Sequence, residues 1–429
     1  MKFVITIIFL SVLAICLPVK GQQSVQFPVK IDSVIIVGNE KTKDEVILRE
    51  IPFTFPDSLT LEDLQVIQNR ISNLLLFNRV ELKLIPAGER NYLMVEVTEM
   101  WYIYPVPIFF LNDKEWDRIS YGFQLTHLNF RGMNELLSIG GWLGYNPAFF
   151  LTYQNPWVGK KKRYILGVRL FTKLVANRFF DFDERHLYGN VTLGKRFDLH
   201  RSIMTTFSLR RIVLPPEFQQ YSVSGNGTDL IPKITLTYKL DYRDLIEYPR
   251  SGYYFEWIIS RSGFTKNQPR FWRFDLDNRA YFKLTPTLSI GGRNLTRLNK
   301  GELPIYDRIF IGYMNRIRGY FDTRMTAKNL MLNSVELRWS ILPIRYLSVK
   351  SDNFFRHFLH NLKYGISLGA FIDSGIAWDS APQLNLKNHN TGYGLGIHIH
   401  LPFIYLIRIE RAWNDQGRGE WIIDSWVTF

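Results

Sequence analysis

The sequence predicts a mainly β protein: an antiparallel transmembrane β-barrel of about 16 strands, preceded by one small α+β domain. Three observations support this fold class. Aromatic residues make up 15% of the 429 residues, although the mean hydropathy is close to zero. From Trp101 onward, segments of about ten residues alternate between apolar and polar side chains and end in turn residues. Beyond the N-terminus, no apolar run reaches the roughly 18 residues that a membrane-spanning helix needs.

The composition also excludes other classes of protein. A disordered chain would be poor in aromatic residues, but this one holds 32 Phe, 22 Tyr and 11 Trp. A disulfide scaffold is excluded because the chain has 1 cysteine. A barrel accounts for the figures well, since aromatic girdles enrich the aromatic residues and a polar lumen lowers the average hydropathy.

Residues 1–21 are interpreted as a secretory signal peptide. Lys2 precedes the apolar stretch Phe3–Leu17, and small residues lead to a predicted cleavage site after Gly21. The stretch is short for a membrane anchor. A lipoprotein modified at Cys16 is disfavoured because the preceding residue, Ile15, is not small.

Residues 27–99 are predicted to form an α+β domain with helices on one face of a three-stranded sheet. Thr60 lies three residues before Asp63, a variant of the capping box, and so marks the start of the second helix. The expected order is strand, helix, helix, strand, strand, at Lys30–Val37, Thr42–Ile51, Leu61–Leu76, Val80–Ile85 and Tyr92–Thr98.

The strand Val80–Ile85 is expected at an edge of this sheet. An edge strand can pair with an extended segment of another polypeptide by β-augmentation. We therefore expect Val80, Leu82 and Leu84 to form a client-pairing edge.

Residues 100–429 are predicted to form the barrel. The even-numbered residues of Leu362–Ile372 form an apolar row, and Lys363–Asp373 supply the opposite row at odd positions, as in a strand with lipid on one side and a lumen on the other. The same alternation runs from Trp421 to the terminal Phe429, which resembles the C-terminal signal of bacterial outer-membrane barrels. A soluble β-sandwich or propeller would need aliphatic inward faces and more regular spacing.

Several motifs, in this order along the chain, resemble the BamA-like superfamily, also called the bacterial surface antigen family, with a single POTRA domain. The N-terminal motifs are Gly38-Asn39, Phe77 with Val80, and Val95-Glu96-Val97 followed by Glu99. The barrel motifs are Asn155-Pro156-Trp157, Leu240–Asp244 with Pro249 and Gly252, Ile317-Arg318-Gly319-Tyr320, Phe371-Ile372-Asp373-Ser374-Gly375 and the terminal Phe429.

The tetrapeptide Ile317-Arg318-Gly319-Tyr320 lies in a connection of roughly 30 residues, and connections of that length are usually functional or disordered. Strand alternation places Asp373 and Glu336 on lumen faces. Because the guanidinium of Arg318 can bind a carboxylate through two donors, we expect this extracellular loop to fold into the barrel. Arg318 would bind Asp373, with Glu336 as a second acceptor. The resemblance implies that this loop is needed for activity, as it is in the family.

The resemblance implies a non-enzymatic protein of the bacterial outer membrane, with its POTRA domain in the periplasm and without cofactors. It would help to insert outer-membrane proteins or to translocate polypeptides. Its expected partners are unfolded outer-membrane or secreted polypeptides, outer-membrane lipid and periplasmic or lipoprotein accessory subunits. The best-known assembly factors carry several POTRA domains, whereas this chain has room for one, which leaves an auxiliary role open.

Other functional signals are weak. The pairs His398 and His400, and His357 and His360, lack a clear third ligand, so no metal site is predicted. Gly392, Gly394 and Gly396 are expected to mark a strand against which a wall or loop packs closely. The basic run Lys160–Arg163 fits a turn or lipid headgroups better than nucleic acid.

Two alternative functions stay open at this point. A passive channel or porin would need neither the POTRA domain nor the loop held by arginine. A barrel-embedded hydrolase would need a Ser-His pair on adjacent strands, which the sequence does not reveal; it also has no Gly-x-Ser-x-Gly elbow and no P-loop.

Overall fold

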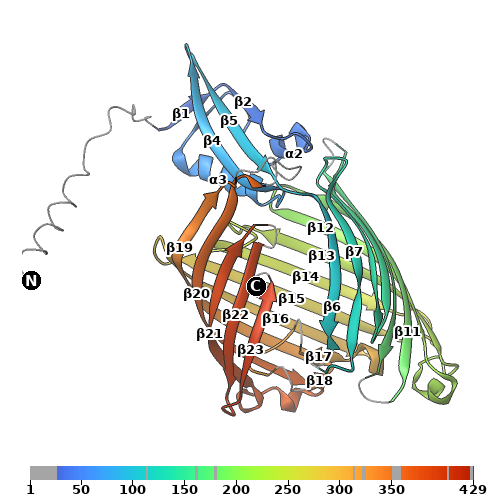
Figure 1. The fold of residues 1–429 in the computed structure, drawn as a ribbon. Coiled ribbons are helices and arrows are strands. Elements are labelled where there is room, and N and C mark those ends of the chain that lie inside the picture. Colours follow the sequence, from blue (N-terminus) through green and yellow to red (C-terminus); the bar gives the residue numbers. More distant parts are fainter. Residues whose placement is uncertain are drawn as a thin grey trace, which may run out of the picture.

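The computed structural model describes residues 27–112, 115–159, 163–177, 181–312, 315–320, 325–349, 359–402, 405–425 and 429. It consists of a small N-terminal domain placed over one end of a large barrel (Figure 1). The predicted signal peptide, His357, Val427 and most of the basic run Lys160–Arg163 lie outside the described residues. No described helix is long and apolar enough to cross a membrane.

The N-terminal domain has the predicted elements in the predicted order, with one additional short strand, β3, between the two helices, and a three-stranded sheet in the order β2-β5-β4. A single buried apolar core, which includes Ile47, Ile67, Ile71 and Leu93, joins the helices to the sheet. The elements are β1 (Val29–Ile31), β2 (Ser33–Val37), α2 (Asp44–Leu48), β3 (Asp57–Leu59), α3 (Leu61–Ser72), β4 (Phe77–Ala87) and β5 (Arg90–Glu99).

Two details of this domain differ from the prediction. The first expected strand is divided into β1 and β2, and β1 pairs with β3 rather than with the main sheet. Helix α3 begins at the expected place, because Thr60 and Asp63 form the complete capping box, but it ends at Ser72 rather than near Leu76. The chain turns there because Leu75 adopts a left-handed conformation, with φ of 56°.

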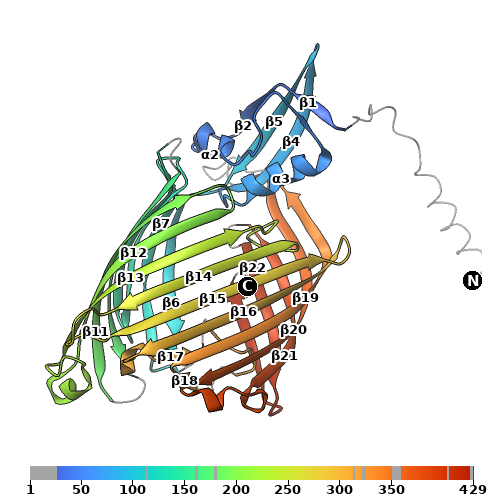
Figure 2. The same ribbon diagram turned by 180° about the vertical axis from the view of Figure 1, so that it is seen from behind.

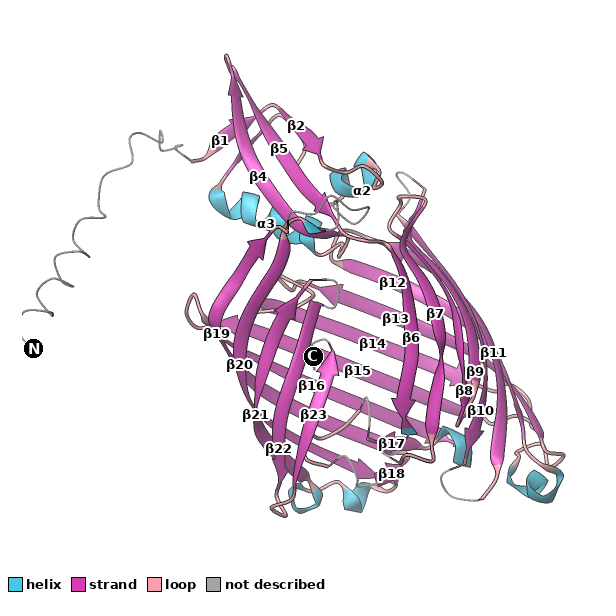
Figure 3. Cartoon of the chain, viewed as in Figure 1, coloured by secondary structure: helices cyan, strands magenta, loops and turns pink. Residues whose placement is uncertain are grey.

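The barrel is one 16-stranded antiparallel sheet, as predicted (Figures 1 and 3). Its two ends are β6 and β23, and no ladder between these two strands is found within the described part of the chain. The strands are β6 (Ile103–Leu111), β7 (Ile119–Phe130), β8 (Glu135–Gly144), β9 (Ala148–Val158), β10 (Tyr164–Ala176), β11 (Asp183–Arg196), β12 (Arg201–Val213), β13 (Thr228–Asp241), β14 (Gly252–Ser262), β15 (Phe271–Lys283), β16 (Leu288–Gly301), β19 (Asn329–Leu347), β20 (Leu362–Trp378), β21 (Asn390–Leu401), β22 (Tyr405–Asn414) and β23 (Gly419–Ser425).

Side chains alternate between the two faces of the barrel wall, as expected for a strand with period two. On β20, Ile366 and Ile372 are exposed on the outside, whereas Ser367, Phe371 and Asp373 are buried on the inside. Apolar residues therefore cover the outer surface, and polar and small residues line the interior.

The connection between β16 and β19 holds η4 (Ile305–Asp307), β17 (Ile309–Ile311) and β18 (Met325–Ala327). Strands β17 and β18 lie at the end of the barrel that is opposite the N-terminal domain (Figures 1 and 2). The shorter helices are η3 (Pro216–Tyr221), η6 (Ala381–Gln383) and η7 (Leu386–Asn388).

The N-terminal domain contacts the barrel through hydrogen bonds to four connections between strands. These connections follow β7, β11, β13 and β19, so the contacts are spread around the barrel mouth. The hydrogen-bonded pairs include Lys43 with Gly132, Arg70 with His200, Asn73 with Asp244 and Ile246, and Thr98 with Asn361.

Candidate functional site: an arginine loop bound in the lumen

The loop tetrapeptide is buried inside the barrel. Ile317, Arg318 and Tyr320 are at most 2% exposed. Ile317 belongs to an apolar cluster with Leu295 and Leu330, so apolar packing at its N-terminal side holds the loop against the wall. Gly319 has φ of +98° and lies close to the backbone of the barrel strand β22, which a residue with a Cβ would not tolerate well.

The guanidinium of Arg318 contacts three buried carboxylates. It binds Asp373 through two donors, with Nε 2.7 Å from Oδ2 and Nη2 2.9 Å from Oδ1. Its Nη1 lies 2.7 Å from Oε2 of Glu336 and 3.0 Å from Oε1 of Glu410. The ring of Phe371 lies 3.4 Å from Cζ, which adds a cation–π contact.

Two further arginines balance these carboxylates. Arg338 donates from Nε to Oε1 of Glu336 at 2.8 Å, and Arg408 donates from Nη1 to Oε1 of Glu410 at 2.7 Å. The buried cluster therefore contains three guanidinium groups and three carboxylates. Because removal of one member of a buried pair leaves an uncompensated charge, the whole set favours a single position of the loop.

Four consecutive strands supply the wall of this site at inward-facing positions. Glu336 and Arg338 lie on β19, Asp373 on β20, and Arg408 and Glu410 on β22. Between them, β21 presents three glycines, Gly392, Gly394 and Gly396, followed by His398. A Cβ on Gly392 would lie 1.8 Å from the carbonyl oxygen of Arg318, so this glycine makes room for the loop backbone.

The structure thus brings Arg318 together with both acceptors that the sequence suggested, Asp373 and Glu336. Gly375, from the predicted strand motif, lies against the side chain of Ile317. The sequence reasoning did not include Glu410, although the alternation of β22 marks it in the same way as Glu336. It also did not include Tyr248, because this residue lies in a turn, where the two-residue alternation of a strand does not apply.

Tyr248 lies in the connection between β13 and β14 and reaches the site from the other side. Its hydroxyl is 2.9 Å from Nδ1 of His398, and Arg338 donates from Nη1 to the carbonyl oxygen of Pro249 at 3.0 Å. This connection also bonds to Asn73 of the N-terminal domain: the carbonyl oxygen of Asp244 accepts from Nδ2 of Asn73, and the N–H of Ile246 donates to Oδ1. The site is therefore joined to that domain by one continuous segment.

Phe429 does not continue the outward row of β23. Trp421 and Ile423 are 66% and 71% exposed, whereas Phe429 is 1% exposed and stacks on Tyr281 inside the barrel. Its carbonyl oxygen accepts a hydrogen bond from Arg338 at 3.3 Å. The buried guanidinium of Arg338 therefore helps to hold Phe429 inside the barrel.

Glu336, His398 and Glu410 could in principle hold a metal ion, since their ligand atoms all lie within 4.8 Å of one another. Both carboxylates already bind guanidinium groups. A divalent cation would have to displace Arg318 and a second arginine from these oxygens, so the donor set fits ion pairs better than a metal centre.

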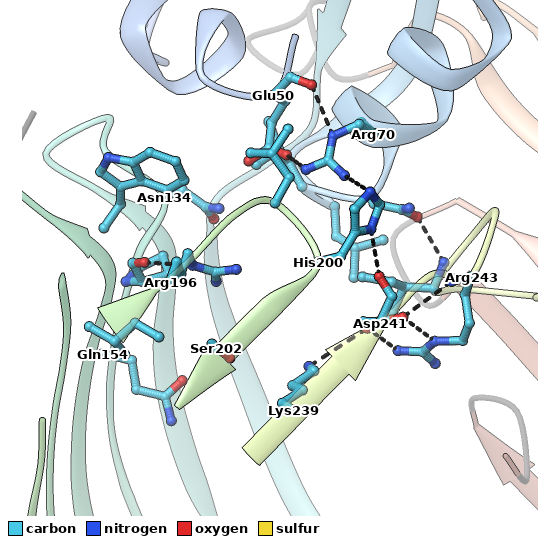
Figure 4. A pocket seen from close by; sticks show the side chains of 18 of the residues that line it. Glu50, Arg70, Asn134, Gln154, Arg196, His200, Ser202, Lys239, Asp241 and Arg243 are labelled. Atoms are coloured by element: carbon cyan, nitrogen blue, oxygen red, sulfur yellow. Dashed lines mark hydrogen bonds and ion pairs between the residues drawn. The ribbon is translucent and has the colours of Figure 1, made fainter. Parts of the chain in front are cut away.

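A cavity of roughly 1070 Å³ lies where the N-terminal domain meets the barrel (Figure 4). Its walls carry both charges, and Arg70 connects the two parts: Nη2 is 2.7 Å from Glu50, and Nη1 is 3.4 Å from Nε2 of His200 on the barrel. Arg243 binds Asp241 through two donors at 2.8 Å. The cavity beneath the N-terminal domain is therefore lined by charged side chains of both signs together with apolar ones.

Fold and site together define a β-barrel whose lumen binds its own loop and whose mouth carries an α+β domain. A model of the Omp85 superfamily domain matches residues 129–421, and a POTRA model, the surface antigen variable number repeat, matches residues 29–100. The chain therefore belongs to the Omp85 superfamily.

Among curated proteins, the chain is 20% identical over 382 residues to the outer membrane protein assembly factor BamA of Nitratidesulfovibrio vulgaris, covering 83% of this chain. It spans only 45% of that relative's length. Among solved structures, BamA from Haemophilus ducreyi lacking POTRA domains 1–3 aligns with a TM-score of 0.52 and 15% identity, covering 93% of this chain and 83% of that one. CdiB from Escherichia coli aligns with a TM-score of 0.54 and 13% identity, covering 93% and 75%.

Proposed function

We propose that this chain is an outer-membrane barrel that assists the insertion of outer-membrane proteins or the translocation of polypeptides, with its POTRA domain in the periplasm. The observation that carries the proposal is the loop of Arg318, which three carboxylates from three strands hold inside the lumen. An open pore does not require a loop held inside the barrel by buried charges, whose desolvation is costly.

The edge of the POTRA sheet supports a role in binding extended polypeptides. Within the residues that the structure describes, strand β4 pairs with β5 alone, and the carbonyl oxygen of Val80 accepts a hydrogen bond from Gln68 of α3 at 2.7 Å. That carbonyl therefore faces away from β5, and by alternation so do the carbonyls of Leu82 and Leu84. Their side chains pack on the domain core, so a client strand would pair with the main chain.

The same arrangement suggests how a client would move. A strand bound at β4 would extend toward the barrel mouth, where Asn78 and Arg79 of β4 form hydrogen bonds with His360 and Asn361 in the connection between β19 and β20. The sequence shows no nucleotide-binding motif, so client folding would supply the free energy.

Photo-crosslinking in cells tests this function. A photoreactive residue in place of Lys83, which is exposed on β4, should form adducts with exported polypeptides. The same residue in place of Glu62, exposed at the start of α3, is the control and should form few adducts. Equal labelling from both positions, or no exported polypeptide from Lys83, would contradict the proposal. Ion conductance together with normal outer-membrane assembly in a deletion strain would favour the passive channel.

A further inference from the structure

The outer surface of the barrel wall carries a hollow of roughly 570 Å³ over strands β10 to β13. In the register of these strands, the four residues Leu170, Gly189, Leu209 and Pro232 are neighbours in one row across the wall. The two leucines are exposed on the outer face, whereas Gly189 has no side chain and Pro232 has a compact one. The hollow therefore arises because two small residues alternate with two leucines in this row.

Further apolar residues form the sides of this hollow. Phe207 and Ile234 are opposite each other in the next row, and Phe264 borders the hollow from the turn after β14. Although Phe264 is exposed, its turn is fixed to the wall, because the N–H of Gly263 donates to the carbonyl oxygen of Pro232 at 2.9 Å. The volume is within the range of about 300–1,000 Å³ that is typical of small-ligand sites, and the apolar walls suit an alkyl chain.

Two arginines lie beside the hollow on the same outer face. Arg211 follows Leu209 by two residues on β12, and Arg185 lies on β11 opposite Val213. Residues in this diagonal relation on neighbouring strands are about 7–8 Å apart, so two like charges are close together. Both side chains are exposed, and within the residues that the structure describes neither forms an ion pair, although Asp183 shares the outer face of β11. An anion from outside the chain would balance these charges.

The arginines lie near the end of the wall that is opposite the N-terminal domain. Strand β11 begins at Asp183 and β12 ends at Val213, and the connection that follows β12 lies at this end of the barrel (Figure 2). With the POTRA domain in the periplasm, this end faces the cell exterior, and the hollow lies in the outer leaflet of the membrane. Arginine on the lipid face of a barrel is costly at the midplane but tolerated near the head groups. Arg185 and Arg211 therefore mark the level at which lipid phosphates lie.

From this arrangement we infer that the outer face of β10–β13 binds a phosphate-bearing lipid of the outer leaflet. One acyl chain of the lipid occupies the hollow beside Leu209 and Phe264, and the head-group phosphate binds Arg185 and Arg211. Guanidinium groups suit this role because they can bind phosphate oxygens through two parallel N–H donors. The arginines select an anionic head group, and the hollow selects the chain. The inference goes beyond the proposed function, since it uses the membrane placement of the barrel but not the binding of clients.

Lipid titration of the purified full chain tests the role of the arginines. The barrel in a maltoside detergent is titrated with diphosphoryl lipid A, and native mass spectrometry measures the fraction with bound lipid. R185Q/R211Q should weaken binding about twentyfold, because each basic group near an anionic lipid contributes a factor of roughly five. K195Q/K300Q, which removes two exposed charges elsewhere on the outer face, is the matched control and should bind as the wild type does. Phosphatidylcholine, which has no net charge, should bind more weakly, and an equal concentration of inorganic phosphate should not displace lipid A.

A second pair of variants tests the hollow. In G189L the new side chain would fill it, and the nearest atom to the added Cβ is the flexible end of Leu170 at 3.3 Å. G292L is the matched control, because Gly292 also lies on the outer face and a Cβ there would meet no atom closer than 3.9 Å. G189L should weaken the binding of lipid A about tenfold, since roughly two methylene groups of the chain would lose their contact with the wall. G292L should leave the affinity unchanged.

Several outcomes would overturn the inference. These are equal affinity of the two double variants, equal affinity of the two glycine variants, displacement of lipid A by inorganic phosphate, and equally tight binding of phosphatidylcholine. Heat-modifiable migration in gels establishes that each variant folds. If one does not, a photoreactive residue in place of Phe264 or of Phe282, an exposed phenylalanine far from the hollow, still decides, because lipid A should form adducts at Phe264 and not at Phe282. Crosslinking of clients from Lys83 is independent of these measurements, so the lipid site and the proposed function can fail separately.

Discussion

The hydroxyl of Tyr248 lies 2.9 Å from Nδ1 of His398, and this contact joins the turn after β13 to the charged cluster of the lumen. Nε2 of His398 faces Glu410 at 3.6 Å, and Glu410 contacts Arg318. The turn that carries Tyr248 also binds Asn73 of the POTRA domain. The POTRA domain at the barrel mouth and the arginine loop inside the lumen are thus connected through contacts of a few buried residues.

Replacement of Arg318 by alanine should destabilise the barrel by about 3–5 kcal/mol, because Asp373, Glu336 and Glu410 would share fewer cations in a buried site. Lysine should rescue little, since an ammonium group cannot bind Asp373 through two parallel donors. The measurement is the temperature at which the folded barrel loses its faster migration in gels. Arg308→Ala, which removes a more exposed ion pair in the same connection, is the control and should shift that temperature little. An unchanged temperature for Arg318→Ala would contradict the role of the loop.

Gly392→Ala should displace the loop, because the new methyl group would lie 1.8 Å from the carbonyl oxygen of Arg318. Overpacking of this kind costs about 1–3 kcal/mol. Gly292→Ala is the matched control, since its methyl group would meet no atom closer than 3.9 Å. Protease cleavage within residues 302–328 of the intact barrel measures the displacement, and equal cleavage of the two variants would argue against close packing at Gly392.

Tyr248→Phe should destabilise the lumen site by about 1–3 kcal/mol, because it leaves Nδ1 of the buried His398 without its partner. The ring and its contact with Arg338 would be retained. Unfolding in urea with Tyr242→Phe as the control measures the effect of the hydroxyl. Similar midpoints for both variants would show that the Tyr248 hydroxyl contributes little.

Asn73→Ala should loosen the POTRA domain from the barrel, because it removes hydrogen bonds of 3.0 Å to Asp244 and 2.8 Å to Ile246, each worth about 0.5–1.5 kcal/mol. Gln65→Ala, exposed on the same helix, is the control. Faster hydrogen exchange in residues 242–251 and larger ion conductance are expected for Asn73→Ala alone. Identical exchange in the two variants would indicate that other contacts hold the domain.

Much of the fold could be predicted because each strand of a membrane barrel places apolar side chains toward the lipid and polar side chains toward the lumen. The alternation of β20 identified Asp373 as a lumen residue, and that of β19 did the same for Glu336, since a charged side chain on the lipid face is costly. The glycines of β21 were correctly expected to mark a place of close packing. The course of the chain end could not be predicted, because the inward position of Phe429 depends on Arg338 and Tyr281, which lie far away in the sequence.

Local alternation, capping and burial can be recognised in the amino-acid sequence, and they specify the strand periodicity, the order of the POTRA elements and the residues that face the lumen. Which of the lumen charges meet follows from the tertiary structure. Glu410, Arg338 and Tyr248 come together with Arg318 and its acceptors because the barrel wall curves and the turn after β13 runs inward. Neither the curvature nor the course of the turn produces a periodic pattern in the sequence.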